Sequence, residues 1–158
     1  MKLYNVYDYA IKKVGDIMIM ISSSETETFN LGVRLGEKLK AGTVLSLNGD
    51  LGAGKTQLTK GIAKGMGIED YVTSPSFTIL NEYEGRVRLY HFDVYRIEDV
   101  NEMYEIGFEE YLFGDGVCIV EWGDMVEEIL PENTIHIKIK RLDEDKRELT
   151  IDDKGLVL

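Results

Sequence analysis

The residues best suited to chemistry lie at positions 49 to 56, where the sequence reads G-D-L-G-A-G-K-T and fits the pattern G-x-x-x-x-G-K-[ST]. The glycines of this pattern let the backbone curl so that successive N–H groups point inward at phosphate oxygens. A helix that begins at Lys55 adds the positive end of its dipole. Lys55 is predicted to reach the β- and γ-phosphates of a nucleotide, and Thr56 Oγ1 is predicted to bind Mg²⁺. The ligand we expect is ATP with Mg²⁺. The residues predicted to bind it here are Gly49, Asp50, Leu51, Gly52, Ala53, Gly54, Lys55 and Thr56.

Two carboxylates close strand-like runs elsewhere in the chain. Glu121 follows the apolar run Val117–Val120, and Asp93 follows Leu89–Phe92. The carboxyl ends of strands next to a phosphate-binding loop converge on the nucleotide crevice. One carboxylate could hold Mg²⁺, directly or through water, while the other orients the attacking water. The sequence does not decide which does which, and either could instead be a surface acid at a strand end. The candidate metal residues are Thr56, Glu121 and Asp93, and the candidate catalytic residues are Asp93, Lys55 and Glu121.

Three further features lie near these positions in the sequence. The segment Thr73–Thr78 is rich in hydroxyl groups around Pro75 and resembles a switch that senses the γ-phosphate or Mg²⁺, although a plain loop explains it nearly as well. Trp122 is expected to pack near the nucleotide, or to be ordinary packing at a strand end. His91 and His136 are isolated, and His136, in an alternating strand, is interpreted as structural.

The spacing of apolar and turn residues predicts the elements that position these groups. A capping box, Ser24 with Glu27, begins a helix whose core-facing positions are predicted as Phe29, Val33, Gly36 and Leu39 and which ends at Gly42. Residues 43–48 form a buried strand before the loop, and residues 55–66 form the helix after it. Residues 77–83 and 86–93 are predicted as a hairpin across Glu84 and Gly85.

The later part of the chain alternates further helices and strands. A polar helical stretch over 98–112 is broken near Gly107, residues 117–121 form a buried strand, and residues 124–130 form a short helix that Pro131 ends. Residues 134–141 and 147–152 form a C-terminal hairpin. The fold class predicted is α/β, a P-loop NTPase-like sandwich with a mixed parallel and antiparallel sheet. Residues 22–158 are expected to be one P-loop ATPase domain. Residues 1–21 are expected to be an extension, a flexible segment or a short strand or helix, with weak helical character over 1–19.

The composition limits the class of protein and its compartment. The chain has 158 residues, 44% of them hydrophobic and 30% charged, as expected for one globular domain. No apolar run approaches the roughly 18 residues that cross a bilayer, and the short run Ile17–Ile21 lacks the length and cleavage site of a signal peptide. The expected location is the cytoplasm, with no membrane contact. Cys118, the single cysteine, has apolar neighbours and is interpreted as a buried core thiol.

The net charge of −11 is concentrated in one stretch of the chain. Between Arg96 and Lys138 there are twelve acidic residues and neither lysine nor arginine. Such a surface repels nucleic-acid phosphates, so direct binding of RNA or DNA is not expected. The stretch is either a solvated face or a docking face for a basic partner.

The order of the motifs resembles the bacterial TsaE (YjeE) family. The resemblance rests on G-D-L-G-A-G-K-T at 49–56, T-S-P-S-F-T at 73–78, H-F-D-V-Y-R at 91–96, G-F-E-E-Y-L at 107–112 and Glu121-Trp122, and it covers roughly residues 22 to 141. It implies an ATPase needed to make threonylcarbamoyladenosine beside the anticodon of tRNAs, acting with the TsaB–TsaD pair. It also implies that Thr56 and Glu121 serve Mg²⁺ and that Asp93 is tied to hydrolysis. Residues 1–19 depart from the family pattern.

Other functions for the same loop stay open at this point. A small-molecule kinase would close an arginine-bearing lid over the phosphates, and no arginine lies in the 97–137 region. A GTP switch would need an N-K-x-D element, which the sequence lacks. A non-catalytic, nucleotide-gated adaptor remains a further alternative. Because arginine is sparse, intrinsic hydrolysis is predicted to be slow unless Arg96 or a partner supplies an arginine to the site.

Overall fold

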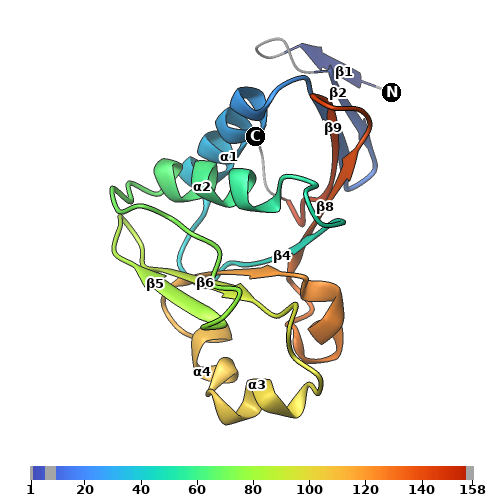
Figure 1. The fold of residues 1–158 in the computed structure, drawn as a ribbon. Coiled ribbons are helices and arrows are strands. Elements are labelled where there is room, and N and C mark those ends of the chain that lie inside the picture. Colours follow the sequence, from blue (N-terminus) through green and yellow to red (C-terminus); the bar gives the residue numbers. More distant parts are fainter. Residues whose placement is uncertain (1, 6–9, 156–158) are drawn as a thin grey trace.

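The computed structural model describes residues 2–5 and 10–155, and the strands within this part form one mixed sheet (Figure 1). The helices are α1 (Glu25–Lys38), α2 (Lys55–Gly65), α3 (Asn101–Glu105), α4 (Phe108–Leu112) and the 3₁₀ helix η1 (Gly123–Ile129). The strands are β1 (Lys2–Asn5), β2 (Ala10–Val14), β3 (Ile17–Ser22), β4 (Val44–Asn48), β5 (Leu80–Tyr83), β6 (Leu89–Asp93), β7 (Val117–Glu121), β8 (Ile135–Arg141) and β9 (Arg147–Asp152).

The order of the strands across the sheet is β1-β2-β3-β9-β8-β4-β7-β6-β5. The strands β8, β4, β7 and β6 are parallel neighbours, and the other neighbouring pairs are antiparallel. Central parallel strands are covered on both faces, which explains why every residue of β4 and β7 is buried. The predicted mixed α/β sandwich is confirmed.

Helices lie on both sides of the sheet and create two apolar cores (Figure 1). The core beside α1 and α2 contains Leu35, Leu58 and Ile137, and the core beside α3 and α4 contains Phe92 and Phe108. Alternate residues of β6 point to opposite faces, so this strand contributes Leu89 to the first core and Phe92 to the second. In the described part of the chain no helix is long and apolar enough to span a bilayer.

The two helices beside the phosphate-binding loop pack through glycines. A Cβ atom added at Gly32, Gly36, Gly61 or Gly65 would lie 2.1 to 2.4 Å from a backbone carbonyl oxygen of the facing helix. The predicted capping box is present, since Ser24 Oγ accepts from Glu27 N at 3.1 Å, although the Glu27 carboxylate reaches Ser23 N rather than Ser24 N. Of the positions predicted for the apolar face of α1, Gly36 and Leu39 are buried. Phe29 and Val33 are half-buried, and it is their backbone carbonyl oxygens that meet α2.

Three predicted elements differ from the structure. The weak helical character expected of residues 1–19 is wrong, since β1, β2 and β3 form antiparallel pairs and β3 joins β9; residues 1 and 6–9 lie outside the described part. Burial of Met18 and Met20 against the first core favours a strand there. The hairpin predicted over residues 77–93 is present as β5 and β6, but both strands are shorter. The first begins at Leu80 rather than Phe77, and the second begins at Leu89 rather than Arg86. Phe77 and Thr78 instead lie in a turn that ends at Ile79, which has φ 68°.

Candidate functional site

The loop over residues 49–54 joins β4 to α2 in a path that requires glycine at its two ends. Gly49 has φ 156°, and a Cβ there would lie 2.5 Å from the carbonyl oxygen of Ile139 on β8. Gly54 caps α2 with φ 110°, a conformation that L side chains rarely adopt. The loop therefore feeds directly into the helix, as anion binding at a helix N-terminus requires.

Lys55 begins α2 and folds back over its own loop. Its Nζ donates to the carbonyl oxygens of Gly49 and Asp50, the second at 2.9 Å, and lies 4.0 Å from the centroid of the Trp122 ring. Burial lowers the pKa of Lys55, and the negative charges of Glu121, Asp93 and Asp50 partly oppose this shift. The ammonium is thus held at the loop with two carboxylates on nearby strands.

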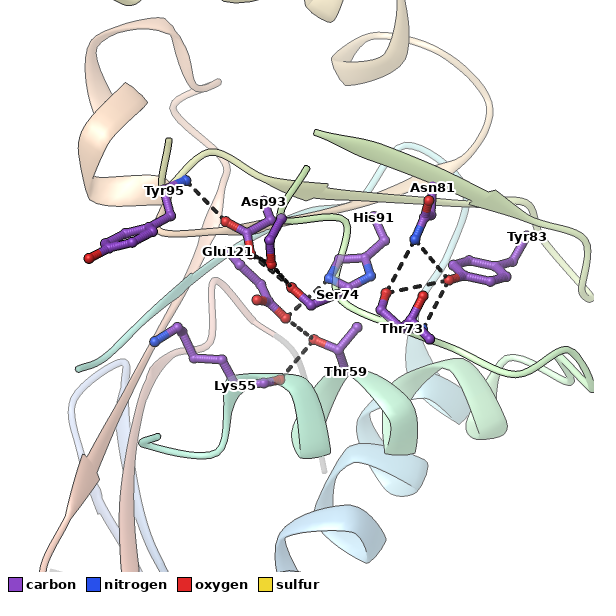
Figure 2. A network of polar contacts seen from close by, with 11 residues as sticks. Lys55, Thr59, Thr73, Ser74, Asn81, Tyr83, His91, Asp93, Tyr95 and Glu121 are labelled. Atoms are coloured by element: carbon purple, nitrogen blue, oxygen red, sulfur yellow. Dashed lines mark hydrogen bonds and ion pairs between the residues drawn. The ribbon is translucent and has the colours of Figure 1, made fainter. Parts of the chain in front are cut away.

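Asp93 and Glu121 lie side by side at the carboxyl ends of β6 and β7. They are register partners of the parallel pair, and both are almost fully buried, at 5% and 2% exposure. Two buried carboxylates side by side are costly unless donors or cations surround them. The predicted convergence of these two strand ends beside Lys55 is what the structure contains (Figure 2).

Donors from the segment 73–79 and from the chain after β6 surround Asp93. Its Oδ2 accepts from Ser74 Oγ at 2.9 Å and from Ser76 Oγ at 3.5 Å, and its Oδ1 accepts from Tyr95 N at 3.0 Å. The backbone N of Asp93 also donates to the carbonyl oxygen of Ile79 at 2.9 Å. The hydroxyl-rich segment identified in the sequence is therefore tied to Asp93.

Glu121 is contacted from two other elements. Its Oε1 lies 3.3 Å from Thr59 Oγ1 on α2 and 3.1 Å from His91 Nε2 on β6 (Figure 2). The residue after it, Trp122, adopts φ 62° and donates its backbone N to the carbonyl oxygen of Leu47 at 2.9 Å. This turn places the Trp122 ring over Lys55 and 4.7 Å from the ring of Tyr95, centroid to centroid.

A cavity of about 450 Å³ lies between the loop and the two carboxylates. That volume is within the range of small-molecule sites. Its lining comprises Leu51, Gly52, Ala53, Gly54, Lys55, Thr56, Gln57 and Lys60 on one side and Ser74, Ser76, Asp93, Tyr95, Glu121 and Trp122 on the other. Gly49 and Asp50 lie beneath it, where their carbonyl oxygens hold Lys55.

The donor set suits a magnesium ion shared with a nucleotide. Among residues 2–5 and 10–155 no group of three or more His, Cys, Asp or Glu side chains could hold a metal by itself. Mg²⁺ commonly takes one or two carboxylates together with substrate phosphates and water. Thr56, Glu121 and Asp93, all lining one cavity with Lys55, fit that arrangement.

Comparison with known proteins decides the family. The model of the family described as "Threonylcarbamoyl adenosine biosynthesis protein TsaE" matches residues 22–149. The chain belongs to the TsaE family. A TsaE named as a tRNA threonylcarbamoyladenosine biosynthesis protein, from Treponema pallidum, is 43% identical over 134 residues, which cover 85% of this chain and 99% of that protein. A TsaE of the same description from Bacillus subtilis is 53% identical over 117 residues, 73% of each chain.

A solved structure gives the same result for the fold. The crystal structure of Bacillus subtilis YdiB superposes with a TM-score of 0.75, is 42% identical, and covers 89% of this chain and 85% of its own. The predicted membership of the TsaE family is confirmed, as is the α/β fold.

Two residues of this TsaE chain contact the site without having been singled out from the sequence: Thr59 contacts Glu121, and Arg147 contacts the loop. His91 and Tyr95 belong to the motif at 91–96 that carries the family resemblance, but no role was predicted for either; they contact Glu121 and Asp93 respectively. A single-residue signal existed for Thr59, since it is a polar residue in a buried element. Arg96 lies away from the cavity lining, 4.5 Å from the Phe77 ring centroid. Cys118 is buried, as predicted.

Proposed function

We propose that this chain is a Mg²⁺-dependent ATPase that acts in the biosynthesis of threonylcarbamoyladenosine next to the anticodon of tRNA. The observation that carries the proposal is the cavity in which Lys55 and Thr56 face Asp93 and Glu121. Membership of the TsaE family supplies the pathway, because its relatives are named for that modification.

Each residue of the proposed site has a distinct role. The backbone of residues 49–54 and the ammonium of Lys55 bind the phosphates, and Thr56 with Glu121 holds the metal. When bound, Mg²⁺ neutralises charge that develops on the phosphate oxygens. Asp93 orients the attacking water, and Ser74 and Ser76 fix the rotamer of its carboxylate through Oδ2. Trp122 packs beside the bound nucleotide and keeps Lys55 in place.

The intrinsic hydrolysis is slow in this proposal. The cavity contains Lys55 and Lys60 but no arginine among its described lining residues. An arginine on the transferring phosphoryl group is worth about 10³–10⁵ in rate where one is present. A partner of the TsaB–TsaD type supplies the missing charge or closes the site, and so raises turnover.

Three further elements of the proposal concern the surroundings of the site. The acidic stretch 97–137 contacts protein rather than tRNA, because its charge repels nucleic-acid phosphates. The protein acts in the cytoplasm. Residues 22–158 form the ATPase domain, and residues 1–21 are an extension whose strand β3 pairs with β9.

Calorimetry with Mg-ATP and Mg-ADP tests the nucleotide site. Saturable binding is expected, and Lys55→Ala lowers the affinity about 10- to 100-fold because charge-assisted hydrogen bonds to phosphate are lost. Lys64→Ala, an exposed lysine of the same helix, is the matched control and keeps the wild-type affinity. The absence of binding to the wild-type protein would reject the site.

A pull-down tests the partner. With ATP present, a complex of the TsaB–TsaD type is retained, and without ATP retention falls. A screen for phosphorylated small products accompanies it, since such a product would favour a small-molecule kinase instead. Retention that is equal with and without ATP, together with unchanged tRNA modification when Lys55→Ala replaces the wild type, would reject the ATPase role.

A further inference from the structure

The Glu121 carboxylate is contacted on one oxygen only, within the part of the chain that the structure describes. Both His91 Nε2 and Thr59 Oγ1 approach Oε1, at 3.1 Å and 3.3 Å, and no described residue donates to Oε2. Glu121 lines the cavity. One oxygen is therefore bound to the scaffold and the other is available to the cavity.

Thr59 is not the main donor to Glu121 Oε1. Its hydroxyl has one proton and faces two acceptors, the carbonyl oxygen of Lys55 at 2.9 Å and Glu121 Oε1 at 3.3 Å. The nearer carbonyl is the better acceptor by distance. The hydrogen bond that fixes Glu121 must then come mainly from His91.

The surroundings of His91 select the tautomer able to donate it. The side chain is fully buried, and Nδ1 has no hydrogen-bond partner in the described structure. A neutral imidazole carries one N–H and one bare nitrogen. With the proton on Nε2, the N–H faces the carboxylate and the bare Nδ1 is left unpaired. With the proton on Nδ1, a buried N–H would be orphaned and a lone pair would face Oε1, which costs more.

The register of the sheet places the two side chains on the same face. His91 stands two residues before Asp93 on β6, so both point to the side of α2. Asp93 is paired with Glu121, and His91 is paired with Ile119, so His91 is diagonal to Glu121 across two parallel strands. A histidine at this position therefore reaches the Glu121 carboxylate from the neighbouring strand, β6.

We propose that His91 is a positioning residue for Glu121: its Nε2–H holds Oε1 so that Oε2 stays available to the cavity, where it would hold the metal. Partners that orient a metal ligand typically alter metal affinity or activity about 10- to 100-fold when replaced. The inference rests on the proposed function, because it assigns Glu121 to the metal. The alternative is that His91 only fills space in the core and does not orient Glu121.

The tautomer is tested first, in the nucleotide-free protein. Two-bond ¹H–¹⁵N correlation spectra distinguish Nε2–H from Nδ1–H, and the sequence has only two histidines. The signals of the other histidine, His136, which is half-buried near Glu127, are identified by replacing that residue. They then serve as the internal reference for the signals of His91. We expect His91 to be the Nε2–H tautomer and its ¹⁵N shifts to move in Glu121→Gln. The Nδ1–H tautomer would overturn the proposal.

Variants of His91 test the positioning itself. His91→Phe keeps a ring but removes the donor, whereas His91→Gln places an N–H near the position of Nε2. In His91→Phe, binding of metal-free ATP is unchanged while the gain in affinity from Mg²⁺ and the hydrolysis rate fall about 10- to 100-fold. His91→Gln recovers most of that loss. If His91→Phe is too unstable by thermal denaturation, His91→Gln against His91→Leu carries the comparison.

A double-mutant cycle separates positioning from general damage. In the Glu121→Gln background His91→Phe adds little further loss, since the group it acts through is already altered. Full additivity, or equal loss in His91→Phe and His91→Gln, would overturn the positioning role. If the wild-type protein does not bind Mg-ATP, the proposed function fails; if it does and His91→Phe behaves like wild type, only this inference fails.

Discussion

Arg147 Nε, on β9, donates a hydrogen bond to the carbonyl oxygen of Ala53 at 2.8 Å, across 94 residues of sequence. Its Nη1 donates to the carbonyl oxygens of Asp143, Glu144 and Lys146 in the turn between β8 and β9. The guanidinium therefore joins the C-terminal hairpin to the phosphate-binding loop. The side of the loop opposite the cavity is supported by this contact.

Replacing Arg147 should loosen the loop. Arg147→Met keeps most of the aliphatic stem but removes the donors, so Ala53 loses its partner and the loop becomes less well ordered. We expect weaker Mg-ATP binding, by no more than roughly 1.5–3 kcal/mol, the range for hydrogen bonds to charged groups, because only the part of that energy that differs between the free and the bound loop changes the affinity. Calorimetry measures it. Arg141→Met, an exposed arginine of the same hairpin, is the control, and equal losses in both variants would contradict a specific role for Arg147.

Asp93 should separate binding from hydrolysis. Asp93→Asn is nearly isosteric, so it keeps the space occupied while removing the charge that orients water. Nucleotide affinity is expected to stay close to wild type and the hydrolysis rate to fall about 100-fold or more, the range for a lost general base. Ser74→Ala, which removes one donor to Oδ2, should give a smaller decrease. A loss of affinity as large as that of Lys55→Ala would reject the separate role.

The glycines between α1 and α2 should not tolerate a methyl group. A Cβ at Gly61 would lie 2.1 Å from the carbonyl oxygen of Phe29, so the helices must move apart. Gly61→Ala is expected to lower the free energy of unfolding by more than about 2 kcal/mol, although alanine has the better helix propensity. Asn30→Ala, on the exposed face of α1, should change it by less than about 0.5 kcal/mol. Denaturant unfolding of both variants checks this, and a stabilised Gly61→Ala would disprove it.

Cys118 should make the protein less stable in alkali. Burial raises the pKa of the thiol from 9.0 to about 12. The unfolded thiol loses its proton at lower pH than the folded one, so this contribution is full below pH 9 and declines as pH rises toward 12. The decline is at most about 1.4 kcal/mol per pH unit. The unfolding free energy of the wild type minus that of Cys118→Val should therefore be lower at about pH 10.5 than at about pH 8. A constant difference would show that Cys118 titrates normally.

Local patterns predicted the elements that carry the site but not all the contacts between them. Apolar runs and glycine spacing are local features of the sequence. They predicted the loop with its flanking strand and helix, and also the strand ends at Asp93 and Glu121. Contacts such as Arg147 to Ala53 depend on the order of strands in the sheet, which one sequence does not give. For residues 17–21 the sequence left a flexible segment, a strand and a helix open, because the apolar run is paired by β9, at the far end of the chain. The pattern of apolar residues gave positions along α1, including the buried Gly36 and Leu39, but it did not show that the backbones of α1 and α2 touch.

The interlocked glycines also determine how movement can travel through this molecule. Since the backbones of α1 and α2 touch at Gly32, Gly36, Gly61 and Gly65, there is no room for one helix to move toward the other. The start of α1 is bound to β3 through the hydroxyl groups of Ser22 and Thr28. Helix α2, which begins at the phosphate-binding loop, is thus connected through α1 to β3, five places along the sheet from the strand that carries Asp93.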